Sequence, residues 1–194
     1  MLRNMKIILG SQSKGRREVL KRMGYDFDVM FAGLDEKAIR CDDPVQLSLA
    51  LANAKADALL PQIKEPSILI TSDQVVACNG ALLEKPADKA EAENYLKNYT
   101  AYPAETITSV VVCNTANGVR KSGTDIAKIW LAPLPDEIVE QYIATGECFL
   151  CSGGFDHEHH LLKPFVLKIE GEKESITGLP KSLTERLIKE AQEI

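Results

Sequence analysis

Long apolar runs, an excess of basic residues and an even set of cysteines are all missing from this chain of 194 residues. No stretch approaches the ~18 consecutive apolar residues of a membrane-spanning helix, and the early stretch MKIILG has neither the length nor the cleavage site of a signal peptide. The formal net charge of -5 disfavours broad contact with a nucleic-acid backbone, which takes a basic surface. These absences predict a cytoplasmic protein that binds neither a membrane nor a nucleic-acid polymer, and they leave room for a local basic pocket.

The five cysteines, an odd number, do not form the paired framework of a secreted disulfide-rich domain. Cys148 and Cys151 nevertheless form a C-x-x-C pattern ahead of His157, His159 and His160, and two thiolates with two imidazoles can complete a tetrahedral zinc site. The usual spacing between such pairs is about a dozen residues, whereas five residues separate Cys151 from His157. The spacing therefore favours ordinary cysteines beside exposed histidines, with a zinc-binding interaction module as an alternative.

Repeats, low-complexity tracts and a linker are also absent, while strand patterns alternate with helix patterns along the chain. This order predicts an α/β fold, built as a single domain over residues 1–194 or as two lobes that share one core. The patterns predict strands at 5–10, 27–31, 67–78 and 164–171, a hairpin over 105–132 that turns near Asn117-Gly118, and helices within 16–23, 42–61, 84–99, 135–146 and 180–194.

The clearest helix pattern lies within residues 42–61. Asp43 is a typical N-cap residue, Pro44 suits the first helical position, and Pro61 lies beyond the end. Lys55 is expected at the edge of the buried stripe, so it need not be fully exposed. That stripe is predicted to comprise Leu47, Leu51, Ala54 and Ala58.

The stretch LGSQSKGRREVLKRMG, residues 9–24, places two arginines where a helix begins. A helix N-terminus presents unpaired N–H groups and the positive end of the helix dipole, so Arg16 and Arg17 oppose it unless an anion binds them all. This arrangement favours an anionic ligand. The alternative is a solvated helix start with Ser13 as its N-cap and two surface arginines.

Asp73 interrupts the strand pattern SILITSDQVVAC, which is apolar on both sides of it. A carboxylate inside such a strand is costly unless it is paired, hydrogen-bonded or bound to a cation. Asp73 is therefore a candidate functional residue. The alternative is an aspartate that turns outward at a strand end.

Seven stretches together resemble the Maf-like nucleoside triphosphate pyrophosphatases: GSQSKGRREVL, DEK, ALANAKADAL, TSDQVV, EKP, SGGFDHE and IEGEKESITGLPKSL. The resemblance implies an elongated mixed β-sheet with flanking helices and a central cleft. It also implies cleavage of a nucleoside triphosphate between its α- and β-phosphates, with a divalent cation such as Mg²⁺ or Mn²⁺. By the same resemblance Ser11 and Arg16 face phosphate, and a homodimer is one assembly the sequence leaves open.

The catalytic roles come from the same resemblance. It implies that Asp73 is the base that orients or deprotonates the attacking water, that Lys55 and Lys85 are the catalytic lysines, and that Glu36 helps Asp73 to hold the metal. Such a set suits phosphoryl transfer, which mainly requires positioning and the neutralisation of spread negative charge. The main alternative is a non-catalytic nucleotide-binding regulator of cell division on the same fold.

Substrate choice is predicted from positions where the family divides. Members acting on dTTP and UTP carry SxSPRR, a threonine after the catalytic aspartate and a late glutamine, whereas this chain has Gln74 and Glu158 there and resembles the branch acting on 7-methyl-GTP. A carboxylate at Glu158 can accept two N–H donors from a guanine-type edge. Lys14 and Gly15 replace a proline and an aromatic ring of that branch, so Gly15 is expected to leave open space for a bulkier modified base. Ser152 replaces the usual alanine.

Overall fold

The computed structural model describes residues 5–193, and its strands and helices alternate as an α/β fold requires. Seven strands form a mixed sheet with the order β2-β1-β3-β5-β6-β7, and β4 pairs with β3. β1 is parallel to both β2 and β3, whereas the β3–β4 and β6–β7 pairs are antiparallel. The predicted fold class, a mixed sheet with flanking helices, is confirmed. The strands are β1 (Lys6–Gly10), β2 (Phe27–Val29), β3 (Ser67–Cys78), β4 (Ala81–Leu83), β5 (Ala104–Asn114), β6 (Arg120–Leu131) and β7 (Val166–Glu170).

The helices follow the predicted order with shifted ends. α1 begins two residues earlier than predicted, because Ser13 caps it and accepts a hydrogen bond from the backbone N–H of Arg16. The α-helices are α1 (Lys14–Arg22), α2 (Pro44–Leu59), α3 (Lys89–Asn98), α4 (Asp136–Ala144), α5 (Lys173–Ile176) and α6 (Lys181–Gln192). Short 3-10 turns are η1 (Glu36–Ala38), η2 (Leu60–Gln62), η3 (Glu147–Leu150), η4 (Ser152–Gly154) and η5 (Lys163–Phe165).

The chain divides into two compact units. The first contains the chain up to Gln74, the segment Thr108–Asp125 and the chain from Glu172 onward, and the second contains Val75–Ile107 and Ile126–Gly171. β3, β5 and β6 each contribute residues to both units.

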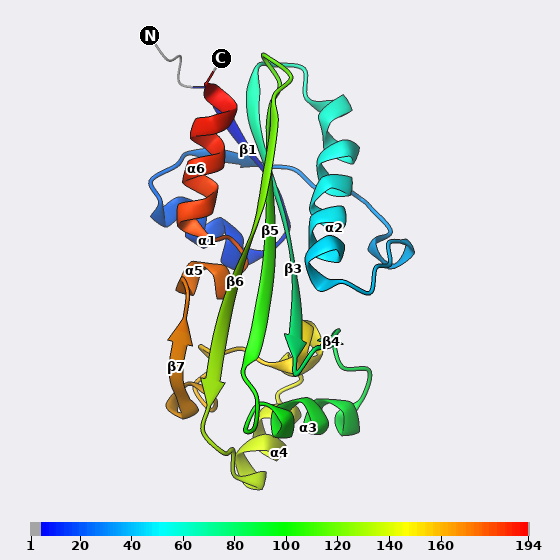
Figure 1. Ribbon diagram of the computed structural model, residues 1–194, viewed down its shortest axis with the longest axis vertical. Helices are drawn as coiled ribbons and strands as arrows, with labels where there is room; N and C mark the ends of the chain where they lie inside the picture. Colours follow the sequence, from blue (N-terminus) through cyan, green and yellow to red (C-terminus); the bar gives the residue numbers. More distant parts are fainter. Residues whose placement is uncertain (1–4, 194) are drawn as a thin grey trace. The chain divides into compact units, whose positions relative to one another are not determined.

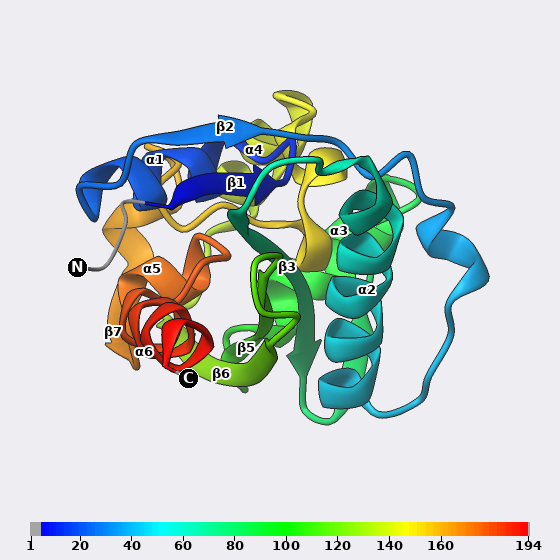
Figure 2. The ribbon, with the colours of Figure 1, turned by 90° about the horizontal axis from the view of Figure 1, so that it is seen from above.

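The first unit has an apolar core on each face of its sheet, because successive strand residues point to opposite faces. In β3, Ile68 and Ile70 join the core formed with α1 and α6, whereas Leu69 joins the core formed with α2. β5 alternates in the same way, with Val110 on the first face and Val111 on the second. Figures 1 and 2 show α2 on one side of β3 and α6 on the other.

α2 is positioned as predicted at its start, and its buried stripe differs from the prediction. The Asp43 carboxylate accepts from the backbone N–H of Gln46, and Pro44 occupies the first helical position. Leu47 and Leu51 are buried, but Ala54 and Ala58 are only half-buried. The stripe instead contains Ser48, Ala52, Ala56 and Leu59. This rotation leaves Lys55 at the inner edge of the helix, with its side chain 12% exposed.

The second unit has its own packed centre around Gly153. A Cβ at Gly153 would lie 2.6 Å from both Tyr99 Oη and Val76 Cγ1, so only glycine fits between them. The hydroxyl of Tyr99 donates to the Gly153 carbonyl at 2.7 Å, and the Gly153 N–H donates to the Glu84 carbonyl at 3.0 Å. The EKP and SGGF stretches, 68 residues apart in sequence at their glutamate and serine, therefore lie against each other in this unit.

Candidate active site

Asp73 lies within β3, at the point where the apolar SILI run gives way to polar residues. Its neighbours along the same face are Leu69 and Thr71, and the hydroxyl of Thr71 donates to the carbonyl of Ala52 in α2 at 2.8 Å. Asp73 is only 6% exposed, so the alternative of an outward-turned aspartate at a strand end is wrong. The strand alternation thus aims a buried carboxylate at α2.

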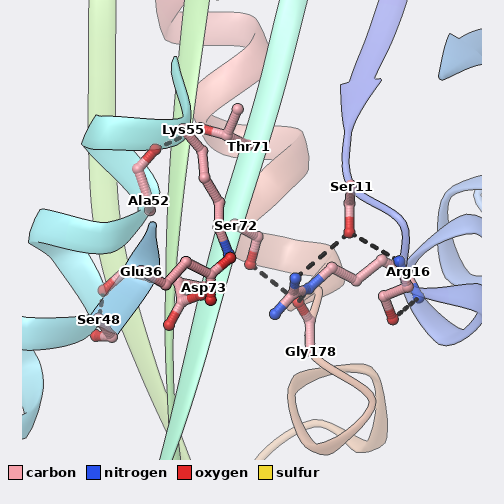
Figure 3. A network of polar contacts seen from close by, with 12 residues as sticks. Ser11, Arg16, Glu36, Ser48, Ala52, Lys55, Thr71, Ser72, Asp73 and Gly178 are labelled. Carbon is pink, nitrogen blue, oxygen red and sulfur yellow. Dashed lines mark hydrogen bonds and ion pairs between the residues drawn. The ribbon is translucent and has the colours of Figure 1, made fainter. Parts of the chain in front are cut away.

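Lys55 of α2 joins two carboxylates (Figure 3). Its ammonium nitrogen lies 2.5 Å from Asp73 Oδ1 and 3.0 Å from Glu36 Oε1. Glu36 is held at the first position of η1, whose N-cap Asp35 accepts from the backbone N–H of Lys37 at 3.2 Å. The structure therefore brings together Glu36, Lys55 and Asp73, and their catalytic roles stay predictions.

Burial is the largest influence on the protonation of Asp73. It raises the pKa of the carboxyl, while the positive charges of Lys55 and Arg16 and the hydrogen bond from Lys55 partly oppose that shift. Glu36 adds to the rise because it is a second negative charge. A carboxylate with a raised pKa is the ordinary means of making a stronger general base near neutral pH.

This raised pKa gives a prediction for stability. Between the unfolded pKa, about 3.9 for aspartate, and the higher folded pKa, the folded protein binds more protons than the unfolded chain. The stabilisation from Asp73 is therefore complete below the unfolded pKa and is lost as pH rises through the folded pKa. Urea unfolding in chelator-treated buffer should show the wild type losing stability relative to Asp73→Asn as pH rises from about 4 toward neutrality. A constant difference at all pH values would contradict this assignment.

Arg16 is fixed at the start of α1 on the other side of β3 (Figure 3). Its Nε donates to the carbonyl of Gly178 at 2.8 Å, and its Nη1 donates to Ser11 Oγ at 3.4 Å. Burial lowers the pKa of Arg16, and the charges of Asp73 and Glu36 oppose that shift. Within the described residues the Arg17 side chain makes neither a hydrogen bond nor an ion pair. The two adjacent arginines therefore have different surroundings, and only Arg16 is held near Asp73.

Ser72 and Gln74 point to the face of β3 opposite Asp73. The hydroxyl of Ser72 donates to the Gly178 carbonyl at 2.9 Å, and Nε2 of Gln74 donates to the Ser175 carbonyl at 2.7 Å. The sequence interpretation gave no role to Ser72 or Gly178. Two sequence signals mark these residues. Ser72 lies in the polar run T-S-D-Q of β3, and Gly178 is the glycine of ITGLP, just ahead of a helix.

Comparisons with known proteins identify the family of this chain. The family model described as "Maf-like protein" matches residues 6–191. The chain belongs to the Maf family. A protein of Dictyostelium discoideum named 7-methyl-GTP pyrophosphatase is 44% identical and covers 96% of this chain and 98% of its own length. A nucleoside triphosphate pyrophosphatase of Synechococcus sp. (strain JA-2-3B'a(2-13)) is 34% identical over 95% of this chain and 93% of its own. A dTTP/UTP pyrophosphatase of Vibrio vulnificus (strain YJ016) is 32% identical over 95% and 98%.

These identities bear on the predicted branch of the Maf family. The chain is more similar in sequence to the 7-methyl-GTP relative, at 44%, than to the dTTP/UTP relative, at 32%. The predicted resemblance to that branch is confirmed at the level of sequence.

Gly15 of this Maf protein packs closely, contrary to the expected open space. A Cβ at Gly15 would lie 2.7 Å from Cγ2 of Thr177 and 3.2 Å from its carbonyl oxygen. The space beside Gly15 is filled by the turn that precedes Gly178, so the expectation of room for a bulkier base there is wrong. Contact between Gly15 and the substrate stays a prediction.

Lys85 and Glu158 belong to the second unit, and both side chains are exposed. Lys85 follows β4 in the EKP stretch, where its charge opposes the rise in the pKa of Cys151 that burial causes. The backbone N–H of Glu158 donates to Asp156 Oδ1 at 2.9 Å, which shapes the turn. Their predicted roles in catalysis and base recognition stay predictions.

The zinc alternative finds no ligand set in residues 5–193. No group of three or more histidine, cysteine, aspartate or glutamate side chains there is arranged to hold a metal ion. Cys148 is fully buried, and the buried imidazole of His159 instead accepts from the Leu161 N–H at 3.2 Å and lies against Tyr142.

The carboxylates of Glu36 and Asp73 fit a hard divalent cation. Mg²⁺ is usually held by one or two carboxylates with waters and substrate phosphates, so two protein oxygens are enough. In the structure the Lys55 ammonium lies between the two carboxylates, which shows that they can share one positive charge. Glu36 and Asp73 are the residues that would hold such a cation, and its binding stays a prediction.

Proposed function

We propose that this Maf protein is a nucleoside triphosphate pyrophosphatase, which hydrolyses its substrate to the monophosphate and pyrophosphate. The observation that carries the proposal is the buried Asp73, bonded to Lys55 and near Arg16, in a chain 44% identical to a 7-methyl-GTP pyrophosphatase. A regulator that only binds nucleotides needs cations for the phosphates but no buried carboxylate with a raised pKa.

Each residue has a distinct task in this reaction. Asp73 accepts a proton from the attacking water or orients it, since its pKa is raised and, among residues 5–193, it has a hydrogen-bond partner on Oδ1 only. Arg16 donates to the Gly178 carbonyl through Nε and to Ser11 through Nη1, and its remaining Nη N–H groups can donate to phosphate oxygens. The Lys55 ammonium, which pairs with the two carboxylates, can also pair with a bound phosphate. Lys85 is proposed as a further positive charge that binds the triphosphate.

The charge balance supports a divalent cation. Asp73 and Glu36 contribute two negative charges, and Lys55 and Arg16 contribute two positive charges, so the four side chains cancel. A triphosphate adds several negative charges that these residues leave uncompensated. We propose Mg²⁺ or Mn²⁺, which would neutralise the phosphates and lower the pKa of a bound water.

The proposed substrate is 7-methyl-GTP or a related nucleotide with a guanine-type edge. The Glu158 carboxylate would accept from the N1–H and amino group of such a base. Nε2 of Gln74 already donates to two backbone carbonyls, of Ser175 and Ile176. Gln74 would therefore offer the base its carbonyl oxygen.

A substrate profile tests this assignment. We expect 7-methyl-GTP to have a higher kcat/KM than dTTP or UTP, and Glu158→Gln to narrow that gap. A carboxylate that the bound base covers without pairing costs about 1–3 kcal/mol, or ~10- to 100-fold. Glu140→Gln, at an exposed position of α4, is the matched control and should leave the ratio unchanged. A profile led by dTTP or UTP, with 7-methyl-GTP inert, would overturn the substrate assignment.

A pyrophosphate-release screen over canonical and modified nucleotides separates the enzyme from a nucleotide-binding regulator. The enzyme releases pyrophosphate from at least one nucleotide, whereas a regulator binds nucleotides without turnover.

No helix within residues 5–193 is long and apolar enough to cross a membrane. We propose that the enzyme acts in the cytoplasm, and the homodimer stays a prediction.

A further inference from the structure

The turn Ser175–Gly178 is held in place by residues of three strands of the first unit, β3, β5 and β6. Nε2 of Gln74 in β3 donates to the carbonyls of Ser175 and Ile176 at 2.7 and 3.2 Å. Thr108 of β5 donates to the same Ser175 carbonyl at 3.1 Å, and the Ser175 hydroxyl bonds Asp125 of β6 at 2.5 Å. So many bonds to a single short turn fix the position of its backbone.

The last residue of this turn holds Arg16. The Gly178 carbonyl accepts from both Arg16 Nε, at 2.8 Å, and the Ser72 hydroxyl, at 2.9 Å (Figure 3). Gly178 has φ +98°, and a Cβ there would lie 3.1 Å from Arg16 Nε. The left-handed backbone therefore favours glycine, and a side chain here would make the Arg16 guanidinium shift.

We propose that the turn Ser175–Gly178 is a positioning element that aims Arg16 at the substrate phosphates, with Ser72 and Gln74 as positioning residues that act through it. The inference rests on the proposed function, because it assumes that Arg16 binds phosphate. It extends that function by assigning roles to Gly178 and Ser72 and a second role to Gln74.

The physical reason is the flexibility of a free arginine. Ordering a long side chain costs conformational entropy, and a bond at Nε fixes the plane of the guanidinium before the ligand arrives. The fork of Nη donors then meets phosphate oxygens in one orientation. β3 also carries Asp73, the proposed general base, between Ser72 and Gln74. The same strand therefore positions both Asp73 and the turn.

A double-mutant cycle between Gly178→Ala and Arg16→Ala tests the proposal. The readouts are the Kd for inorganic tripolyphosphate and kcat/KM for the best nucleotide of the screen. We expect Gly178→Ala alone to weaken both about 10-fold or more, and to add nothing once Arg16 is alanine, because the guanidinium that it displaces is gone. Gly24→Ala is the matched control, since Gly24 has φ +85° with open space around it. It should leave both values unchanged per folded molecule.

Ser72 provides a second variant if Gly178→Ala does not fold. Ser72→Ala removes one donor from the Gly178 carbonyl and should weaken tripolyphosphate binding several-fold, with Ser72→Thr restoring it. Additive effects of Gly178→Ala and Arg16→Ala would overturn the positioning role of the turn. Normal tripolyphosphate binding by both Gly178→Ala and Ser72→Ala would also overturn it. A wild type that neither binds tripolyphosphate nor hydrolyses any nucleotide would instead overturn the proposed function, and this inference with it.

Discussion

Replacing Asp73 by asparagine should lower kcat about 10²- to 10⁴-fold, which is the usual range for losing a general base. The amide is similar in size to the carboxylate, and its oxygen can still accept from the Lys55 ammonium, so a hydrogen bond replaces the ion pair and no void forms. What disappears is the group that takes a proton from water. Steady-state pyrophosphate release, normalised to folded protein by circular dichroism, measures this loss.

The matched control is Asp57→Asn in α2. Asp57 pairs with Arg120 and has a side chain 63% exposed, so the same chemical change there should leave kcat within about a factor of two, since exposed ion pairs contribute little. Near-normal turnover by Asp73→Asn would remove Asp73 from the mechanism. A loss of thermal stability with unchanged turnover would give Asp73 a structural role only.

Replacing Arg16 by alanine should weaken nucleotide binding about 10- to 100-fold, the effect expected from losing charge-assisted hydrogen bonds of 1.5–3 kcal/mol. Arg17→Ala should have a much smaller effect, because adjacent helical side chains point about 100° apart and Arg17 lacks the contacts that hold Arg16. Isothermal titration with a slowly hydrolysed nucleotide analogue gives both values.

Comparing Arg16→Ala with Arg17→Ala tests whether the start of α1 binds phosphate. Both arginines contribute the same charge, so a purely long-range electrostatic effect would make the two losses equal. Equal and negligible losses would return residues 9–24 to a solvated helix start capped by Ser13. A large loss confined to Arg17→Ala would place the phosphate on the other side of the helix.

Local patterns predicted the parts of the site that depend on periodicity. The buried strand made the single carboxylate of Asp73 conspicuous, and helical spacing placed Lys55 at the edge of the stripe that faces it. Ser13 was recognisable as an N-cap because its chemistry is local. The stripe itself was misjudged at Ala54 and Ala58, because alanines at every second position from 50 to 58 place small residues on every face of the helix.

The contacts around Gly178 depend on chain pairing that no local pattern contains. Arg16 and Gly178 are separated by 162 residues, and the turn at the end of α5 is held beside Arg16 by residues of three strands, including Ser72 and Gln74 of β3. Strand alternation could assign those two residues to the face opposite Asp73. Which segment packs on that face is a tertiary result. The same turn fills the space at Gly15, which the sequence alone presented as open.

The products of hydrolysis test the central claim most directly. Phosphorus NMR of the wild-type reaction with 7-methyl-GTP and Mg²⁺ should show the monophosphate and pyrophosphate appearing in equal amounts, with no diphosphate at any time. The same signals should be nearly absent with Asp73→Asn and normal with Asp57→Asn. Release of the diphosphate and inorganic phosphate, or no turnover of any nucleotide in the screen, would contradict the account.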